Sequence, residues 1–187
     1  MVASMVVFCD PAGPEGSVGS DFVAVINALV GQDYELLQYL FFLVGPNDEV
    51  RQTYESHIAQ HLPLAAVRRV EGNPGYGPTQ NAAARLVEGD NGLFLFLHDD
   101  VCLASNAVSE LVTELSRSNA AVVGPKLVQW DDPSLLQHVG MGVDRCGEID
   151  PIVLPGEKDQ QQHDAVADVF CLPSACLLVR SDLFRTL

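Results

Sequence analysis

The stretch Leu93-Phe94-Leu95-Phe96-Leu97-His98-Asp99-Asp100 contains five consecutive apolar residues, followed directly by a histidine and two acids. Because the apolar residues do not alternate with polar ones, the stretch predicts a strand covered on both faces, as the central strands of parallel sheets are. Open α/β sheets bind their ligands at the carboxyl ends of such strands. The stretch therefore predicts an α/β fold and places a candidate site at residues 98–100.

Apolar segments of strand length alternate with segments of helical period along the rest of the chain, which is the pattern of βαβ units. In residues 21–32, for example, Phe22, Ile26 and Leu29 fall on one helical face. The pattern predicts one α/β domain with three layers and a mainly parallel central sheet. The expected strands span residues 4–9, 37–44, 65–70, 93–97, 120–128 and 169–179, and the expected helices span 21–32, 49–61 and 105–116, with two more starting near 79 and at 181.

The composition is that of a folded and strongly acidic protein. The 187 residues include 25 Asp and Glu but only 10 Lys and Arg, for a formal net charge of −15, and such a chain repels nucleic acid. With 48% apolar and 19% charged residues, the chain has too much apolar surface to stay disordered. The amino terminus has no basic segment, and no apolar run reaches the roughly 20 residues of a membrane span. We therefore expect a cytoplasmic domain that binds no nucleic acid.

The soft metal ligands of the sequence do not form a known pattern. The five cysteines are odd in number and widely spaced, which fits neither a disulfide framework nor a zinc ribbon, so we expect reduced and mostly buried thiols. His57 and His61 have the spacing of a zinc-protease motif, but the residues between them include no glutamate base. A solvated helix face is the interpretation that we prefer for this pair.

Two acids follow the apolar stretch. Because side chains alternate along a strand, Asp99 and Asp100 point in different directions, so that one can reach a cation while the other accepts a hydrogen bond from a hydroxyl or a backbone group. The same pair also fits a purely structural interpretation, in which one acid caps the next helix and the other is solvated. The two residues alone do not decide between these interpretations.

A glycine-rich loop, Asn73-Pro74-Gly75-Tyr76-Gly77-Pro78-Thr79-Gln80-Asn81, leads into a predicted helix. Free N–H groups at a helix amino terminus and the helix dipole favour an anion. A simple turn with Thr79 as the N-cap explains the same residues. The loop by itself is therefore weak support for a phosphate site.

Two other classes of protein share parts of the pattern. Lys126 after a strand, together with Asp99 and Asp100, is typical of a phosphoacceptor receiver domain, but receivers carry the acid pair after the first strand. A nucleotidyltransferase also uses acid-bound Mg²⁺ on a related sheet, but its first loop is basic, and residues 10–20 contain no Lys or Arg. The nucleotidyltransferase stays open as a second alternative.

Taken in order, the segments of the chain resemble the nucleotide-sugar-dependent glycosyltransferases of family 2, which have the GT-A fold, and especially their rhamnosyltransferase-like branch. The resemblance covers most of the chain. The family's L-N-D-D-V motif matches Leu97-His98-Asp99-Asp100-Val101, with His98 in place of the Asn. The other matching motifs are Gln32-Asp33-Tyr34, the set Asn73, Gly75 and Asn81, with Thr79 in place of the family's Ala, the V-G-P-K at residues 123–126, the set Gly140, Asp144 and Gly147, and SACLLVRSDLF at residues 174–184.

This resemblance implies roles for specific residues. Asp100 would hold Mg²⁺ or Mn²⁺ on the diphosphate of the sugar nucleotide, and Asp99 would meet the ribose or share in metal binding. The loop residues Asn73, Gly75 and Asn81 would shape the wall beside the nucleotide. The end of the first strand, at Cys9, Asp10 and Pro11, would border a uracil or thymine base, so the implied donor is a UDP- or dTDP-sugar.

The resemblance also implies a reaction and a partner. The chain would belong to a metal-dependent, inverting transferase that moves a sugar to a glycan or lipid-linked acceptor, as in cell wall or polysaccharide biosynthesis. The alternative is a non-catalytic nucleotide-binding or interaction module of a larger, membrane-associated protein.

Two departures from the family pattern affect these expectations. Family members close the second strand with an Asp that holds the base, whereas this chain reads Val44-Gly45-Pro46-Asn47-Asp48, which leaves Asp48 as the candidate substitute. The family's Gly-Gly-Phe-Asp acceptor segment and its Glu-Asp catalytic pair would come after Leu187. We therefore expect residues 1–187 to be a nucleotide-sugar-binding GT-A domain that is incomplete at its carboxyl end, with the base beyond Leu187 and with little activity alone.

Overall fold

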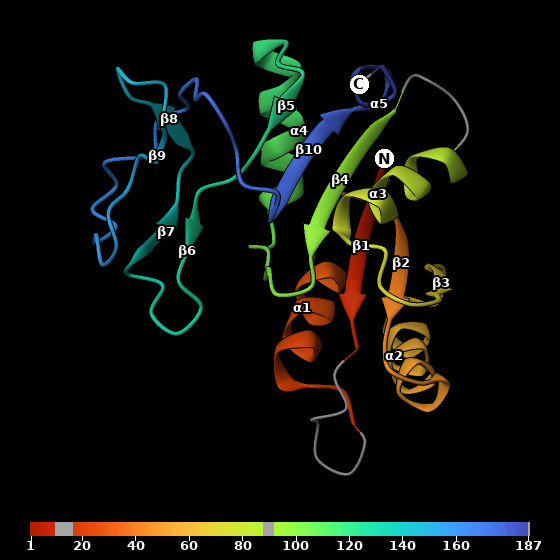
Figure 1. Cartoon of the computed structure of the whole chain (residues 1–187). Helices are drawn as coiled ribbons and strands as arrows, with labels where there is room; N and C mark the ends of the chain where they lie inside the picture. Colours follow the sequence, from red (N-terminus) through yellow and green to blue (C-terminus); the bar gives the residue numbers. More distant parts are fainter. Residues whose placement is uncertain (10–16, 88–91, 187) are drawn as a thin grey trace.

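A six-stranded sheet with the strand order β3-β2-β1-β4-β10-β5 forms the centre of the molecule in the computed structural model, which describes residues 1–9, 17–87 and 92–186 (Figure 1). Strands β1 to β4 are parallel, and β10 is antiparallel to both of its neighbours, β4 and β5. The predicted α/β class with a mainly parallel sheet is therefore confirmed. The strands of this sheet are β1 (Val2–Phe8), β2 (Gln38–Val44), β3 (Ala66–Val70), β4 (Leu93–His98), β5 (Val122–Val123) and β10 (Cys176–Arg180).

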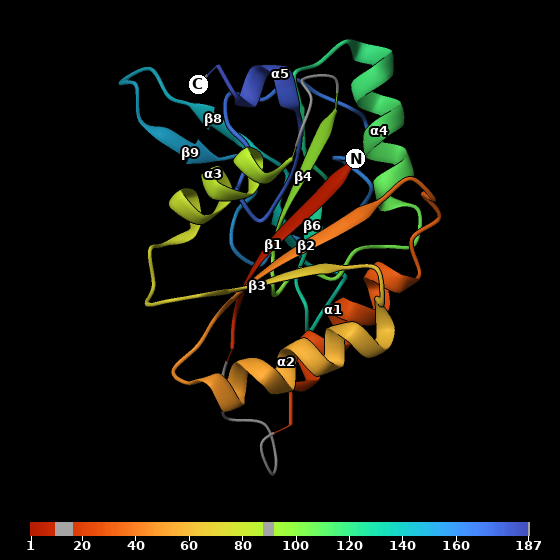
Figure 2. The same ribbon diagram turned by 90° about the vertical axis from the view of Figure 1, so that its right-hand side faces the viewer.

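In the described part of the chain, five helices connect or follow these strands and cover both faces of the sheet. They are α1 (Ser20–Val30), α2 (Asp48–His61), α3 (Tyr76–Leu86), α4 (Ala107–Ser118) and α5 (Ser181–Phe184). Figure 2 shows α1, α2 and α4 on one side of the sheet and α3 and α5 on the other. The three predicted layers are therefore present.

The apolar stretch of residues 93–97 forms β4, which lies between β1 and β10. The side chains of Phe94, Leu95, Phe96 and Leu97 are all buried. Leu95 and Leu97 pack on the larger core with α1 and α4, whereas Phe94 and Phe96 face α3 and α5 on the opposite side. A strand buried on both faces is what an apolar run without alternation predicts, and this prediction is confirmed.

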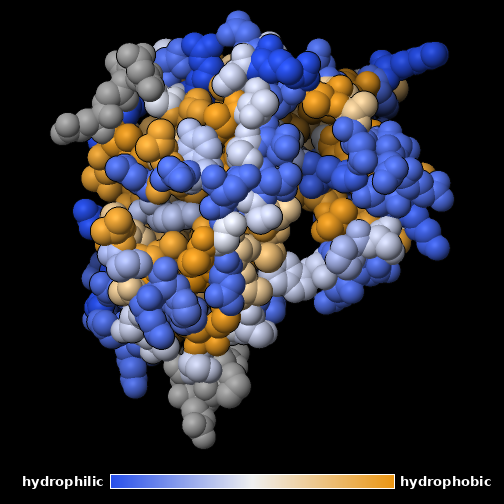
Figure 3. Space-filling view, turned by 180° about the vertical axis from the view of Figure 1, so that it is seen from behind, coloured by the Kyte–Doolittle hydropathy of each residue, from blue (hydrophilic) through white to orange (hydrophobic). Residues whose placement is uncertain are grey.

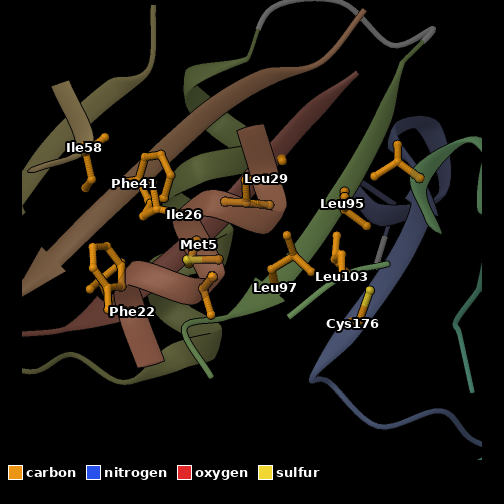
Figure 4. Close-up of a cluster of buried hydrophobic side chains, with 14 of the residues drawn as sticks. Met5, Phe22, Ile26, Leu29, Phe41, Ile58, Leu95, Leu97, Leu103 and Cys176 are labelled. Carbon is orange, nitrogen blue, oxygen red and sulfur yellow. The ribbon is translucent and has the colours of Figure 1, made fainter. Parts of the chain in front are cut away.

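The larger core lies between the sheet and α1, α2 and α4 (Figure 4). The predicted apolar face of α1 is confirmed, because Phe22, Ile26 and Leu29 are buried there. Asn47 caps α2 by accepting a hydrogen bond from the backbone N–H of Val50 at 2.9 Å. This cap fixes the start of α2 directly after the carboxyl end of β2.

Three predicted boundaries were wrong, each for a local backbone reason. The predicted strand 120–128 is split into β5 and β6 (Leu127–Val128) around Gly124 and Pro125, because a proline has no N–H to donate to a neighbouring strand. The predicted strand 169–179 is ordered as a strand only at Cys176–Arg180, after Pro173. The third helix begins at Tyr76 with Gly75 as its N-cap, so Thr79 is not the cap.

The chain between β5 and β10 forms two small sheets beyond the main sheet (Figure 1). Residues 129–153 contain three short strands. Figure 3 shows this part of the chain on the right, with a mostly hydrophilic surface and a smaller apolar area. One small sheet pairs β6 with β7 (Leu136–His138), and the other pairs β8 (Met141–Val143) with β9 (Ile149–Pro151).

None of the described helices has the length and apolar character that crossing a membrane requires. The five cysteines are free thiols, as expected, but only Cys9 and Cys176 are buried. The expectation that most of the thiols are buried was therefore wrong.

Candidate functional site

An open cleft of about 770 Å³ lies at the carboxyl ends of β1, β2 and β3. In parallel strands these ends meet at one edge of the sheet, the lower edge in Figure 1. The cleft therefore lies where the sequence placed a ligand site. It is lined by Phe8, Cys9, Val44, Gly45, Pro46, Arg51, Glu71, Gly72 and Asn73.

Gly45 keeps the floor of this cleft open. A Cβ atom at this position would lie 3.0 Å from Cβ of Cys9 and 3.1 Å from Cγ of Arg51, which is tighter than ordinary van der Waals contact. The glycine that replaces the family's aspartate therefore allows the chain after β2 to pass close to both residues.

Arg51 joins the end of β2 to the first turn of α2 at the wall of the cleft. Its Nη1 donates to the carbonyl oxygen of Gly45 at 3.0 Å, and its Nη2 donates to Oδ1 of Asp48 at 2.7 Å. The side chain is only 12% exposed, and its Nε is buried without a hydrogen-bond partner among the described residues. Sequence reasoning missed Arg51, although its i,i+3 spacing from Asp48 in the first turn of α2 indicates such a pair.

Asp48, the expected substitute for the base-holding aspartate, lies in that first turn of α2. Its side chain is 76% exposed, and the hydrogen bond and charge of Arg51 hold the pKa of its carboxyl below the usual value. The carboxylate is thus engaged by Arg51 and is not among the residues that line the cleft.

Cys9 lines the cleft as a neutral thiol. Burial and the nearby Asp99 raise its pKa to about 12, and its backbone N–H donates to the carbonyl oxygen of Val44 at 2.7 Å. This contact extends the pairing of β1 with β2 to the floor of the cleft. The other two residues expected beside the base, Asp10 and Pro11, lie outside the described residues.

Asp99 ties the end of β4 to the end of β1. Its Oδ2 accepts a hydrogen bond from the backbone N–H of Phe8 at 2.6 Å. Burial raises the pKa of this carboxyl in spite of that hydrogen bond, and the neighbouring charge of Asp100 raises it further. Because Phe8 also lines the cleft, Asp99 lies at its border.

Asp100 follows Asp99 in the turn after β4, so the alternation expected of a strand does not apply to this pair. Its side chain is 80% exposed, and its Oδ1 lies 4.0 Å from Nδ1 of His98. An exposed carboxylate at the edge of a sheet fits a hard divalent cation, which binds one or two carboxylates together with phosphate oxygens and water. Within the described ranges no group of three His, Cys, Asp or Glu side chains could hold a metal, so phosphate or water oxygens would complete such a site.

The glycine-rich loop is shaped by its own side chains. Oδ1 of Asn73 accepts from the backbone N–H of Gly75 at 3.0 Å, and Oγ1 of Thr79 donates to the carbonyl oxygen of Gly75 at 2.7 Å. Gly75 has a φ of +91°, which favours glycine. Asn73 therefore borders the cleft next to the start of α3, whereas Asn81 lies exposed further along α3 and does not line the cleft.

His98 connects β4 with two other segments. Its Nε2 lies 3.1 Å from Oγ of Ser174, and its ring meets the ring of Tyr76 edge-on, with centroids 4.6 Å apart. Tyr76 in turn donates from its hydroxyl to the carbonyl oxygen of Ser174 at 3.3 Å, and burial raises the pKa of this phenol to about 12. Sequence reasoning missed this cluster, because Ser174 is distant in the chain.

The remaining candidates lie elsewhere. Lys126 forms ion pairs with Asp159 and Asp164, which does not support the receiver interpretation. The rings of His57 and His61 contact each other at a tilt of 45°, with centroids 4.6 Å apart. His57 is half-buried, and burial together with the charge of His61 lowers its pKa. The expected solvated face is therefore wrong for His57.

Comparison with known proteins gives one family match and several similar structures. The family model described as glycosyl transferase family 2 matches residues 20–187. The structure of GalNAc-T7 with UDP, GalNAc and Mn²⁺ has a TM-score of 0.67 and 12% identity, over 98% of this chain and 35% of the other. No curated protein sequence matches the chain significantly.

One bacterial and one archaeal structure are also similar to this chain. S. aureus TarS 1-349 has a TM-score of 0.57 and 16% identity, over 100% of this chain and 49% of the other. The mannosyltransferase PcManGT from Pyrobaculum calidifontis, in complex with GDP-Man and Mn²⁺, has a TM-score of 0.55 and 14% identity, over 70% of this chain and 36% of the other. These likenesses confirm the fold class, and the chain spans half or less of the length of each of these proteins.

Proposed function

The chain belongs to glycosyl transferase family 2, and on this premise we propose that it binds a nucleoside-diphosphate-sugar, UDP- or dTDP-linked, as the donor of a metal-dependent, inverting glycosyl transfer. The proposed acceptor is a glycan or a lipid-linked glycan of cell wall or polysaccharide biosynthesis. Within the family we propose the rhamnosyltransferase-like branch, on the motifs around Asn73 and Ser174.

One observation carries this proposal: the cleft and the acid pair share one edge of the sheet. Phe8 lines the cleft, and its backbone N–H is held by Asp99. A nucleoside in the cleft would therefore have its ribose beside Asp99 and its diphosphate toward Asp100. Cys9, Gly45 and Asn73 line the cleft and would contact the base or the ribose. We also propose that four further residues lie next to the nucleotide: Asp10, Pro11, Gly75 and Asn81. Asp48 would act on the base through Arg51.

The charges at this edge support a need for a cation. The chain has a formal net charge of −15, Asp99 and Asp100 are adjacent, and Arg51 is already paired with Asp48. A diphosphate brought to these acids would meet like charge, which disfavours binding unless a cation lies between them. Asp100 would hold Mg²⁺ or Mn²⁺, with Asp99 beside it. The bound ion would neutralise the charge that develops on the departing nucleoside diphosphate.

The remaining roles belong to the whole protein. Inversion requires a carboxylate base that takes the proton of the acceptor hydroxyl. Because the chain spans 35% of the length of GalNAc-T7 and 49% of TarS 1-349, we propose that this base lies outside residues 1–187 and that these residues alone transfer little sugar. The five free thiols support the cytoplasmic location that we propose, at the membrane face in the whole protein.

Calorimetric titration tests the function without requiring turnover. We expect UDP or dTDP to bind the chain in the presence of Mn²⁺ or Mg²⁺ and to bind much more weakly in the presence of a chelator. ATP serves as the control nucleotide. The absence of binding by UDP, dTDP and GDP with either metal would contradict the proposal and favour the non-catalytic module.

A further inference from the structure

His98 is fixed in one orientation by contacts from two other segments. Its backbone N–H donates to the carbonyl oxygen of Ala175 at 2.9 Å, its Nε2 lies 3.1 Å from Oγ of Ser174, and Tyr76 packs edge-on against its ring. These contacts come from α3 and from the segment before β10. The imidazole therefore cannot turn freely, and its Nδ1 faces Asp100.

One of the two neutral tautomers of His98 that fit the contact with Ser174 leaves Nδ1 free for a cation. When Nε2–H donates to Oγ of Ser174, the neutral ring carries a lone pair on Nδ1. Histidines that bind metals are generally held in this way, by a hydrogen bond from the nitrogen that does not bind the metal.

From this geometry we propose that Nδ1 of His98 and a carboxylate oxygen of Asp100 bind the same divalent cation, and that the site therefore prefers a first-row transition ion such as Mn²⁺ to Mg²⁺. The proposal rests on the proposed function, because oxygens of the donor diphosphate and water complete the coordination. Ligand atoms on one octahedral ion lie roughly 3 Å apart. The present separation of 4.0 Å closes by rotation of the exposed Asp100 side chain.

The preference follows from the nature of the donor atom. Mg²⁺ strongly favours oxygen ligands and keeps its water, whereas imidazole nitrogen is a good ligand for first-row transition ions. The residue that the family motif has at this position is asparagine, which offers no such nitrogen at neutral pH. His98 would therefore give this chain a metal preference that the motif does not provide.

Pulsed electron paramagnetic resonance of the protein with Mn²⁺ and UDP tests the proposal directly, because the nuclear spin of a coordinated imidazole ¹⁴N modulates the Mn²⁺ signal. We expect this modulation in the wild type and its loss in His98→Asn. We also expect His98→Asn to weaken Mn²⁺ binding by about tenfold while Mg²⁺ binding changes little. His163→Asn is the matched control, because this histidine lies beside Glu157 and away from the proposed site. It should leave the binding of Mn²⁺ and of Mg²⁺ unchanged.

The outcomes separate this inference from the proposed function. If UDP binds with Mn²⁺ but the wild type shows no ¹⁴N modulation, the inference is overturned and the proposed function stands. This measurement needs no variant, so it decides the question even if His98→Asn does not fold. If UDP binds with neither Mn²⁺ nor Mg²⁺, the proposed function fails and the inference fails with it.

Discussion

Oδ2 of Asp99 accepts a hydrogen bond from the backbone N–H of Phe8 at 2.6 Å, so that a carboxylate directly after β4 holds the last residue of β1. The same carboxyl has a raised pKa, because the fold partly buries it. Its charge is therefore unfavourable for the folded state, although its hydrogen bond is favourable. A group of this kind is expected where function requires the charge.

Asp99→Asn separates these two effects. The amide oxygen can still accept from Phe8, while the partly buried charge is removed, so we expect a melting temperature at pH 7 no lower than that of the wild type. Because the pKa of Asp99 is raised in the folded state, wild-type stability gains from this group as the pH falls through that pKa, and the variant should lack this gain. Scanning fluorimetry from pH 7 to pH 4 measures both. A clear drop in melting temperature at pH 7 would contradict the assignment.

Asp100→Asn tests the metal ligand. The neutral amide keeps the shape but loses the charge that a hard cation requires, so we expect Mn²⁺-dependent UDP affinity to fall by about tenfold or more. The side chain is 80% exposed, so the melting temperature should stay the same. Glu35→Gln, which removes an exposed acid before β2, is the matched control. Equal affinities in calorimetry for the wild type and Asp100→Asn would exclude Asp100 as the ligand.

Gly45→Ala tests the cleft independently of the metal. The added Cβ would lie about 3 Å from Cys9 and Arg51, so one of them must move, and we expect UDP affinity to fall severalfold with a loss of about 1–3 kcal/mol in stability. Gly77→Ala is the control, since a Cβ there meets nothing within 4 Å. Unchanged UDP binding by Gly45→Ala, measured by calorimetry, would place the nucleotide elsewhere.

The lowered pKa of His57 should make the folded protein less stable in mild acid. Burial and the charge of His61 lower its pKa in the folded state, so the unfolded chain binds the proton more tightly. Stability is therefore lost as the pH falls below the unfolded value of about 6.5. We expect the melting temperature of His57→Gln to depend less on pH than that of the wild type between about pH 7.5 and pH 5.5. Parallel curves for the two proteins would show that His57 does not contribute.

Gly140→Ala tests how the two small sheets are held. Gly140 has a φ of +116°, and a Cβ there would lie 2.6 Å from Cγ1 of Val169, so we expect the free energy of unfolding to fall by about 2 kcal/mol or more. Gly142→Ala, two residues along in β8, has open space for its Cβ and should change it by less than about 0.5 kcal/mol. Urea denaturation measures both. Equal effects would mean that Val169 moves aside freely.

The main sheet could be predicted from the sequence because its strands are local patterns. The apolar run 93–97 and the helical period of residues 21–32 each depend on neighbouring residues alone, and both became the elements that they predict. The part between β5 and β10 was predicted less well. Its strands, β6 to β9, have only two or three residues each, and so short a segment carries no period.

In the candidate site, too, the residues that follow from a local sequence pattern could be predicted, and the contacts between distant residues could not. The acids Asp99 and Asp100 stand out because they follow the most apolar strand. The contact between Asp99 and Phe8 joins the turn after β4 to the end of β1, and the contact between His98 and Ser174 depends on β10 returning to β4. No local pattern contains such pairs, because they exist only after the sheet has formed.

The position of β10 between β4 and β5 sets an order of assembly. Although β5 comes earlier in the chain, β10 is its partner in the sheet, so it can join only after residues 176–180 have been synthesised and have paired with β4. Leu97 and Cys176 are partners in that pairing, and the loop that it closes contains α4 and both small sheets, which makes it a slow, non-local step. On the ribosome, β1 to β4 and their helices can therefore pair first, while one side of β4 stays open as a temporary edge until the late strand arrives.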